Sequence, residues 1–401
     1  MINETVLTNS GVYARIEPRV GLFCFSPTTC LLFAVAESES RSTLQWLQGG
    51  HATQVSEVTQ ARLGKGWSKS KTQVQIEGRQ LLPSAESWGN LPILRQPLAI
   101  NWLITGRCPL ACRYCYAEDL MRSRVQEPER VDVQRIADAI LRYSPLYVVL
   151  TGGDPLFSPF LQTAIESLSG RTGIIVDTSA YTLTKRHVES FRDHGVGVRI
   201  SVDSARPKVN DSQRIVYSEL PLGARRGGAL ERALRGIDLC LDADVSLTIQ
   251  TVATKKNAND LVDLGDRLFR MGVKSWRVFK VAPSQLRMSE YLLLVGGKTD
   301  KGGTYSSRKK DGPYKFVFKN LVESHRLHWK SSMALQLTMS ESPNSVVLVS
   351  ADGRFFTESN MGQGKVLIDP RSPRRPSMSS LATMVDMSGH ASRYLNLEYG
   401  S

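Results

Sequence analysis

Three cysteines in one short stretch are the residues of this sequence best suited to carry chemistry. Cys108, Cys112 and Cys115 stand within NWLITGRCPLACRYCYAED at C-x3-C-x2-C spacing, whereas the other three cysteines are scattered along the chain. Three thiolates on one loop can wrap around an iron–sulfur cube. A complete 4Fe–4S cluster normally takes four protein thiolates, so three would leave one iron open to a small ligand.

Two other interpretations of the cysteines remain open at this point. Zinc binds thiolates, but a closed structural zinc site needs four ligands, and no nearby His or Cys supplies the fourth. Alternatively, the three thiols could be packed in a core with no metal. The close spacing and the helix-discouraging Pro109 favour a metal-binding loop over a metal-free core, and the missing fourth ligand favours a cluster over zinc.

A second motif, LTGGDPL at 150–156, follows the next apolar run of the chain. Gly152 and Gly153 carry no Cβ, so the backbone there can come close to a ligand. Asp154 adds a carboxylate, and Pro155 restricts the path by which the chain leaves the turn. A tight strand-to-helix turn without a ligand would have the same composition.

Alternating strand and helix patterns place these motifs in an α/β fold. Apolar or β-branched runs occur at 100–105, 146–151, 173–178, 196–202, 245–252 and 276–282, and helical patterns lie between them at 131–141, 160–168, 184–193, 229–242 and 259–271. Six strands separated by amphipathic helices predict parallel pairing with right-handed crossovers. Periodicity by itself leaves a partial barrel and an open doubly wound sheet as alternatives.

The cysteine motif, with the aromatic Tyr114 before its last cysteine, resembles the signature of the radical S-adenosylmethionine (radical SAM) superfamily. The resemblance covers roughly 97–285 and implies a partial (β/α)6 barrel, one 4Fe–4S cluster held by Cys108, Cys112 and Cys115, and S-adenosyl-L-methionine on the open iron. It also implies reductive cleavage of that cofactor to a 5′-deoxyadenosyl radical, which abstracts hydrogen from a substrate. An electron donor such as a flavodoxin or a ferredoxin would supply the electron.

The same resemblance implies where the cofactor binds. Family members have Gly-Gly-Glu-Pro where this chain has Gly152, Gly153, Asp154 and Pro155, so the acid here keeps its charge but has a shorter reach. Ligands of parallel α/β sheets bind at the carboxyl ends of the strands. By resemblance, the strand-end residues expected near the cofactor or the substrate are Ser179, Ser201, Asp203, Thr251 and Asn257, and Tyr114 of the cysteine motif is expected to border the cofactor as well.

Two flanking regions complete the predicted domain organisation. Residues 1–90 contain three short strands, a helix near 41–48 and a second candidate helix near 51–63, and they resemble a small winged-helix domain that grips leader peptides. Such a domain captures a peptide at a strand edge. A domain that merely covers one edge of the barrel is the alternative. Residues 286–401 form a C-terminal extension whose last part predicts a hairpin at Asp352-Gly353.

The C-terminal extension bears on the substrate. Many peptide-modifying relatives carry a C-terminal domain rich in cysteines that hold auxiliary clusters. No cysteine follows Cys240 in this chain, so clusters of that type are not expected. His390 and the hairpin at Asp352-Gly353 are expected to close over the substrate end of the barrel, without an assigned chemical role. A ribosomally made peptide is the leading substrate hypothesis.

Charge supports a rival substrate. The 401 residues carry 51 Lys and Arg against 38 Asp and Glu, a net charge of +13, and 298–330 combines nine basic residues with several aromatics. This composition suits a nucleotide or single-stranded RNA, although a solvated lysine-rich loop has the same composition. A third hypothesis is a binding module whose barrel has lost catalysis. No apolar run is long enough to span a membrane and no signal peptide is evident, so a cytoplasmic protein is expected.

Overall fold

A ten-stranded sheet forms the centre of the molecule. The computed structural model describes residues 4–49, 94–115, 117, 130–217, 227–281, 294, 312–330, 332–338, 344–357, 366–368 and 385–395. Within these residues the strand order of the main sheet is β13-β12-β11-β9-β8-β7-β5-β14-β15-β16. The predicted second candidate helix near 51–63 and most of the basic stretch before residue 312 lie outside the described residues.

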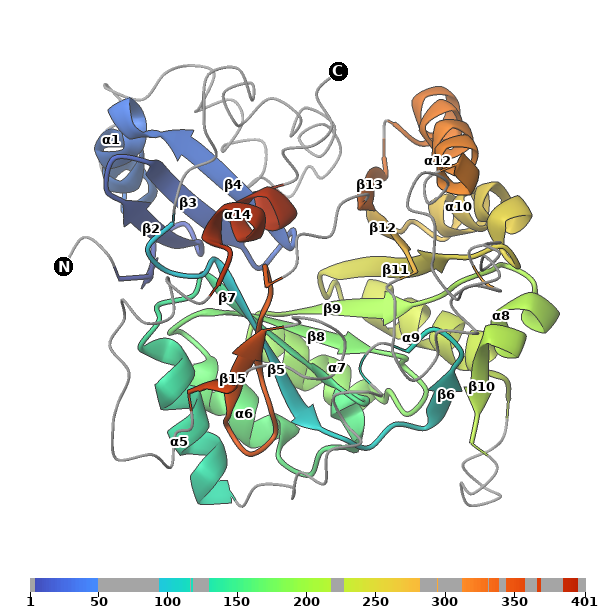
Figure 1. Cartoon of the computed structure of the whole chain (residues 1–401), viewed down its shortest axis with the longest axis horizontal. Coiled ribbons are helices and arrows are strands. Elements are labelled where there is room, and N and C mark those ends of the chain that lie inside the picture. The colour runs from blue at the N-terminus through green and yellow to red at the C-terminus, as the bar shows by residue number, and fades with distance from the viewer. Residues whose placement is uncertain are drawn as a thin grey trace, which may run out of the picture.

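The six predicted strands form the parallel middle of this sheet. They are β5 (Ala99–Thr105), β7 (Tyr147–Gly152), β8 (Gly173–Thr178), β9 (Val196–Ser201), β11 (Leu247–Ala253) and β12 (Ser275–Lys280). Each is hydrogen-bonded in parallel to its neighbour in the order β5-β7-β8-β9-β11-β12. The curved sheet remains open across the described strands, so the architecture is the partial barrel that the sequence predicts (Figure 1).

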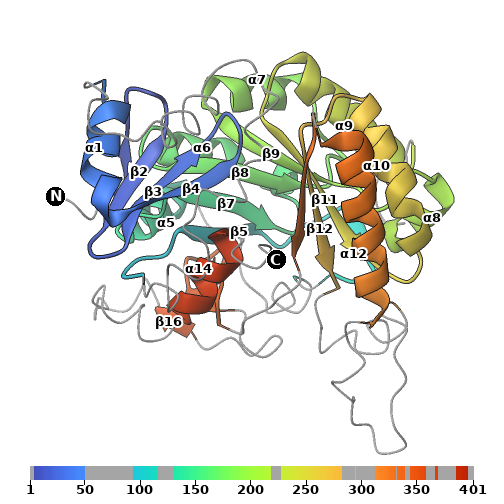
Figure 2. The ribbon, with the colours of Figure 1, turned by 90° about the horizontal axis from the view of Figure 1, so that it is seen from above.

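The predicted helices cover one face of the sheet. They are α5 (Arg130–Leu141), α6 (Leu161–Leu168), α7 (Lys185–Asp193), α9 (Ala229–Asp242) and α10 (Leu261–Arg270). Figure 2 shows α7, α9 and α10 along the outer side of the curved sheet. A Cβ at Gly236 in α9 would meet Ile200, and one at Gly265 in α10 would meet Trp276. Ile200 and Trp276 therefore point to this outer face. Their sequence neighbours point to the opposite, inner face, because side chains alternate along a strand.

Both ends of the sheet are longer than predicted. β13 (Ala334–Thr338) adds a parallel strand beside β12. At the other end β14 (Val347–Val349) pairs in parallel with β5, and β15 (Phe355–Thr357) and β16 (Val366–Ile368) follow as antiparallel strands. The predicted hairpin at Asp352-Gly353 therefore exists between β14 and β15. The hairpin widens the sheet beside β5, and because β14 runs parallel to β5 its turn lies toward the carboxyl end of the strands. That it closes over a substrate stays a prediction.

The N-terminal region folds as a separate antiparallel sheet with one described helix. Its strands are β1 (Val6–Leu7), β2 (Tyr13–Glu17), β3 (Gly21–Ser26) and β4 (Leu31–Ala36), paired in chain order, and α1 (Glu37–Leu47) follows. The three longer strands match the three that the sequence predicts. Val12, Ala14, Leu22, Cys24, Val35 and Leu47 form a small core of their own.

This N-terminal sheet packs on the amino ends of the barrel strands. The Phe25 ring stacks on Tyr147, with ring centroids 4.5 Å apart, and a Cβ at Gly173 would meet the same ring. The buried Arg15 donates to the carbonyl oxygens of Gln96, Pro97 and Ser144 just before β5 and β7. Figure 1 shows the N-terminal sheet and the cysteine-bearing β6 at opposite ends of the barrel.

His390 lies at this same amino end, which corrects the expectation that it closes the substrate end. It belongs to α14 (Met387–Leu395) and is fully buried. Its Nε2 accepts a hydrogen bond from the Leu98 backbone N–H at 2.9 Å, and its Nδ1 donates to the Ser345 carbonyl at 2.7 Å. The ring thus satisfies backbone groups just before β5 and β14.

Candidate active site

The three cysteines lie at the carboxyl end of β5, on a loop that a second segment holds in place. The loop contains the short strand β6 (Leu110–Cys112), which pairs antiparallel with β10 (Arg214–Val216) so that Cys112 lies opposite Arg214. The backbone N–H of Arg113 donates to Gln213, and its side chain donates to Ser212, both at 3.0 Å. This two-stranded clamp was not predicted, because strands of three residues carry no recognisable periodicity.

The thiols of this loop are half-buried and share one electrostatic environment. Cys108 and Cys112 pack beside Leu110, Tyr181 and Ala229. Burial is the main cause that raises the pKa of the Cys108 thiol, and the nearby Asp154 and the two other cysteines raise it further. A free thiolate is therefore disfavoured at Cys108, and a bound metal would have to stabilise it.

The set of donors distinguishes the two metal hypotheses. Within the described residues, no three His, Cys, Asp or Glu side chains are arranged around one point as ligands of a single metal ion. A zinc ion would need such a common point. A 4Fe–4S cube instead binds each thiolate to a different iron, so its protein sulfurs stand apart. What favours a cluster over a closed zinc site is the donor set itself: three thiolates on one loop, with no nearby His or fourth Cys in the sequence to complete four zinc ligands.

The two glycines at the end of β7 lie against the backbone that leads into the cysteine loop. Gly152 has φ +124°, a conformation that favours glycine, and a Cβ on it would meet the Thr105 carbonyl. A Cβ on Gly153 would meet the backbone of Arg107. The Gly153 N–H donates to Thr105 at 2.8 Å, and the Asp154 N–H donates to Arg107 at 2.7 Å. The close approach predicted for these glycines is thus made by the chain itself.

Asp154 is fully buried, and protein donors surround its carboxylate. Its Oδ1 accepts from the Leu156 N–H at 3.1 Å, which caps a short 3-10 helix, and from the Thr178 hydroxyl at 2.7 Å. Its Oδ2 accepts from the backbone N–H of Ser179 at 3.0 Å and from the Ser179 hydroxyl. The predicted site residues Asp154 and Ser179 are therefore brought together, and their side chains tie β7 to the end of β8.

Tyr114, Asp203 and Arg214 form a buried network between the cysteine loop and the end of β9. The Tyr114 hydroxyl donates to Asp203 and accepts from Arg214 at 2.8 Å, while Arg214 lies 3.7 Å from the Asp203 carboxylate. The other Asp203 oxygen accepts from the Val252 N–H at 3.0 Å. Burial raises the pKa of Asp203, whereas the Arg214 charge acts in the opposite direction. The sequence does not identify Arg214 as a site residue, because its role depends on the pairing of β10 with the cysteine loop, which lies about a hundred residues earlier in the chain.

The remaining predicted residues divide between two faces of the sheet. Ser201 is half-buried on the inner face, and its hydroxyl makes no hydrogen bond within the described residues. Thr251 lies on the outer face, where its hydroxyl donates to Val202 and accepts from Trp276. The buried Asn257 donates to the carbonyls of Asp203 and Val252, so it joins β9 to β11. Of these three side chains, only that of Ser201 is free to contact a ligand.

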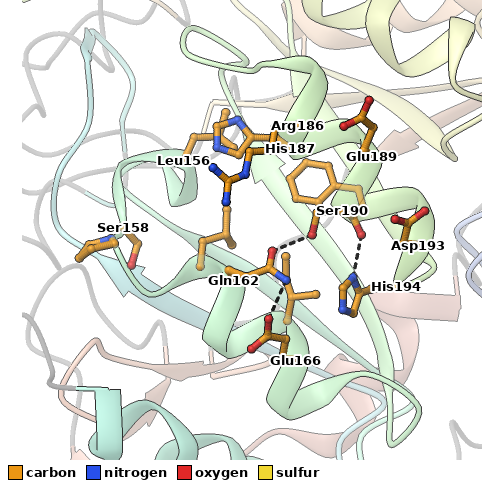
Figure 3. A pocket seen from close by; sticks show the side chains of 14 residues that line it. Leu156, Ser158, Gln162, Glu166, Arg186, His187, Glu189, Ser190, Asp193 and His194 are labelled. Carbon is orange, nitrogen blue, oxygen red and sulfur yellow. Dashed lines mark hydrogen bonds between the residues drawn. The ribbon is translucent and has the colours of Figure 1, made fainter.

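A surface pocket lies outside the barrel between α6 and α7 (Figure 3). Gln162, Glu166, Ser190 and His194 line it, and hydrogen bonds already join the first three to one another. Its lining contains none of the cysteines and none of the strand-end residues discussed above. It is therefore separate from the candidate active site.

Comparison with known proteins identifies the class of domain. Residues 102–268 match the sequence model of the radical SAM superfamily. The chain therefore contains a radical SAM domain, and domains of this family use a 4Fe–4S cluster and S-adenosylmethionine. The matched residues include the three cysteines, the Gly-Gly-Asp-Pro turn and five of the six central strands.

Individual relatives are distant. The AdoMet-dependent heme synthase of Nitratidesulfovibrio vulgaris is 25% identical over 46% of this chain and 48% of its own length. The PqqA peptide cyclase of Rhizobium meliloti is also 25% identical, over 48% of this chain and 50% of its own. The chain thus spans about half the length of the curated relatives it matches.

Solved structures show a similar fold over most of the chain. SuiB of Streptococcus suis, solved with S-adenosylmethionine, has a TM-score of 0.55 at 13% identity and covers 87% of this chain and 82% of its own. The same protein bound to its precursor peptide SuiA has a TM-score of 0.54 at 14% identity, with coverage of 88% and 82%. At this identity the likeness establishes the fold alone.

Proposed function

We propose that this protein is a radical SAM enzyme that abstracts hydrogen from a peptide substrate. The observation that carries the proposal is the cysteine loop at the carboxyl end of β5, held against the Gly-Gly-Asp-Pro turn within a radical SAM domain. When bound, the cluster and S-adenosylmethionine supply a one-electron cleavage whose product takes a hydrogen atom from the substrate. The protein contributes the binding, the orientation and the electrostatics of the site.

The residues of this chain have separate roles in the proposal. Cys108, Cys112 and Cys115 hold the cluster, and the backbone of Gly152, Gly153 and Asp154 borders the cofactor. Ser201 offers a free hydroxyl on the inner face. Tyr114, Asp203 and Arg214 orient the cysteine loop, and Ser179, Thr251 and Asn257 support the strand ends. These assignments are supported by where the residues lie, at or just after the carboxyl ends of β5, β7, β8, β9 and β11.

A peptide substrate is supported by what similar proteins are named for. One relative is a peptide cyclase, and a protein of similar fold has been solved with a precursor peptide. We propose that β4, an edge strand of the N-terminal sheet, captures a leader segment by strand addition. A flavodoxin or ferredoxin is the proposed electron donor, and the cytoplasm is the proposed location. None of the described helices is both long enough and apolar enough to cross a bilayer.

The proposal is tested by anaerobic reconstitution with iron, sulfide and S-adenosylmethionine, followed by reduction with dithionite. We expect a 4Fe–4S spectrum and release of 5′-deoxyadenosine from the wild-type protein. Cys112→Ser should abolish both, because a cube with two protein thiolates is poorly held. Cys240→Ser is the matched control: Cys240 is buried in α9, on the outer side of the sheet, and both signals should persist.

Two results would contradict the proposal. A reconstituted wild-type protein that holds a cluster but releases no 5′-deoxyadenosine would favour a binding module without catalysis. Strong, salt-dependent RNA binding that is lost when Lys309 and Lys310 are neutralised would favour a nucleotide or RNA substrate over a peptide.

A further inference from the structure

Two arginines lie on the inner face of the barrel, below the strand ends that border the proposed cofactor site. Arg199 in β9 follows Val198 and precedes Ile200, and Ile200 points to the helix α9 on the outer face. Arg277 in β12 follows Trp276, which points to α10. Since side chains alternate along a strand, both arginines point inward.

The strand register places Arg199 next to Ser201 along β9 and Arg277 across the intervening strand β11. Gln250 of β11 is paired with Ser201 on one side and with Arg277 on the other. Arg199 lies one inward-facing position before Ser201 along β9, and Asp177 of β8 is its partner across the sheet. The guanidinium groups therefore belong to the same side of the sheet as the one free hydroxyl among the predicted strand-end residues.

The positive charge at this position is only partly balanced within the described part of the chain. Asp177 lies 3.5 Å from Arg199, and no second carboxylate is paired with either arginine there. Arg277 has a buried Nε with no hydrogen-bond partner, and its guanidinium lies 5.1 Å from the ring centroid of Phe279. Burial, together with the nearby charge of Arg199, lowers the pKa of Arg277 to about 10.

The Arg277 Nε is buried without a hydrogen-bond partner among the described residues, and such a group is costly unless a ligand satisfies it. The amino end of the inner face is filled by the N-terminal sheet, because a Cβ at Gly197 would meet the Cys30 sulfur and Phe25 covers Tyr147. Toward the carboxyl end the side chains are more accessible: Asp177 is 25% exposed, and Ser201 and Gln250 are half-buried. A ligand can therefore reach the arginines from the cofactor side.

We propose that Arg199 and Arg277 bind a carboxylate of the peptide substrate and so hold it beneath the cofactor. Two guanidinium groups and one carboxylate leave a single positive charge, which matches a monovalent carboxylate better than a phosphate dianion. Guanidinium groups bind carboxylates through paired hydrogen bonds, which also fix orientation. The inference rests on the proposed function, because it assigns the residues that bind a carboxylate of that enzyme's substrate.

The test measures binding separately from turnover. The full-length protein is reconstituted with its cluster and S-adenosylmethionine but without reductant, and ligand-observed NMR follows three probes. These are N-acetylglutamate α-amide, its neutral analogue N-acetylglutamine amide, and inorganic phosphate. We expect the glutamate derivative to bind at least about fivefold more tightly than the glutamine derivative, because only the former carries a charge for the arginines.

Variants assign the binding to this site. Arg277→Gln should weaken binding of the glutamate derivative at least about tenfold, since it loses a charged hydrogen-bond partner. Asp177→Asn should strengthen binding several-fold, because it removes the competing carboxylate. Arg171→Gln replaces an exposed arginine paired with Asp138 on the outer side, and it should leave binding unchanged.

Several outcomes would overturn the inference. These are equal binding of the two amides, an Arg277→Gln variant that binds like the Arg171→Gln control, and tighter Arg277-dependent binding of phosphate than of carboxylate. If Arg277→Gln does not fold, as judged by circular dichroism, unchanged affinity in Asp177→Asn overturns it instead. Release of 5′-deoxyadenosine, measured on the same preparations after reduction, reports separately whether the proposed enzymatic function holds.

Discussion

At the scale of single residues, the buried histidine of α14 links the stability of the fold to pH. Burial lowers the pKa of His390 from 6.5 to about 3, and the hydrogen bond to the Ser345 carbonyl opposes that shift only in part. The folded protein therefore keeps this ring neutral at pH values where an unfolded chain would bind a proton. Stability is fully present above pH 6.5 and is lost progressively as the pH falls toward 3.

This histidine leads to a measurable pH dependence. Between pH 6.5 and 5.0, we expect His390 to remove about 2 kcal/mol from the free energy of unfolding, at about 1.4 kcal/mol per pH unit for one proton. His390→Gln should be less stable at neutral pH but should lose less stability over the same interval. The measurement is urea unfolding at both pH values.

His328→Gln, at an exposed position of the chain, is the control and should lose as much stability on acidification as the wild type. A drop of equal size in His390→Gln and in His328→Gln would show that His390 is not the group responsible.

At the scale of elements, the cysteine loop owes its position to contacts with the segment after β9. β6 pairs with β10, and the Tyr114–Asp203–Arg214 network lies beneath that pairing. All three side chains are almost fully buried. Because a buried charged group that loses its partner is costly, the network makes the loop and the end of β9 interdependent.

A double-mutant cycle measures that interdependence. Tyr114→Phe and Asp203→Asn should each reduce the free energy of unfolding by about 1–3 kcal/mol, and the double variant should lose clearly less than their sum. Urea unfolding of the cluster-free protein gives the energies. The electron paramagnetic resonance spectrum of the reconstituted variants should also broaden if the loop holds the cluster less uniformly.

Tyr181→Phe provides a matched control for the hydroxyl. Tyr181 is 1% exposed, and its hydroxyl has no hydrogen-bond partner within the described residues. Its removal should change stability by less than about 0.5 kcal/mol. Strict additivity of Tyr114→Phe and Asp203→Asn would show that the two side chains act independently.

At the scale of the whole molecule, the N-terminal sheet is part of the barrel's core. Phe25 and Tyr13 belong to the main hydrophobic cluster, together with residues of β5, β7 and β8. This sheet therefore closes the amino end of the barrel whether or not its edge also binds a peptide. From the sequence, a domain that covers one edge of the barrel was the alternative. In the structure the N-terminal sheet instead covers the starts of the barrel strands.

The contact predicts cooperative unfolding of the two parts. Phe25→Ala removes a ring that is 1% exposed and stacked on Tyr147, so it should cost about 3–5 kcal/mol. Thermal unfolding should remain one transition at a lower temperature. Phe316→Ala in α12 (Gly312–Ser324) is the control, because Phe316 is 68% exposed and its loss should be nearly neutral. A separate low-temperature transition in Phe25→Ala would mean that the N-terminal sheet unfolds independently.

The amino-acid sequence by itself determined the cysteine loop, the six parallel strands with their helices, and the resemblance of residues 97–285 to the radical SAM superfamily. These features depend on the local spacing and the periodicity of residues, which can be recognised in the sequence without knowing which distant segments come into contact. Only the tertiary structure decided that Gly153 faces the Arg107 backbone, that Asp154 binds Thr178 and Ser179, and that Thr251 points to the outer face. It also decided the hydrogen-bond partners of Arg214 and His390. Such assignments depend on which distant segments meet and on which face a strand turns inward, and packing sets both.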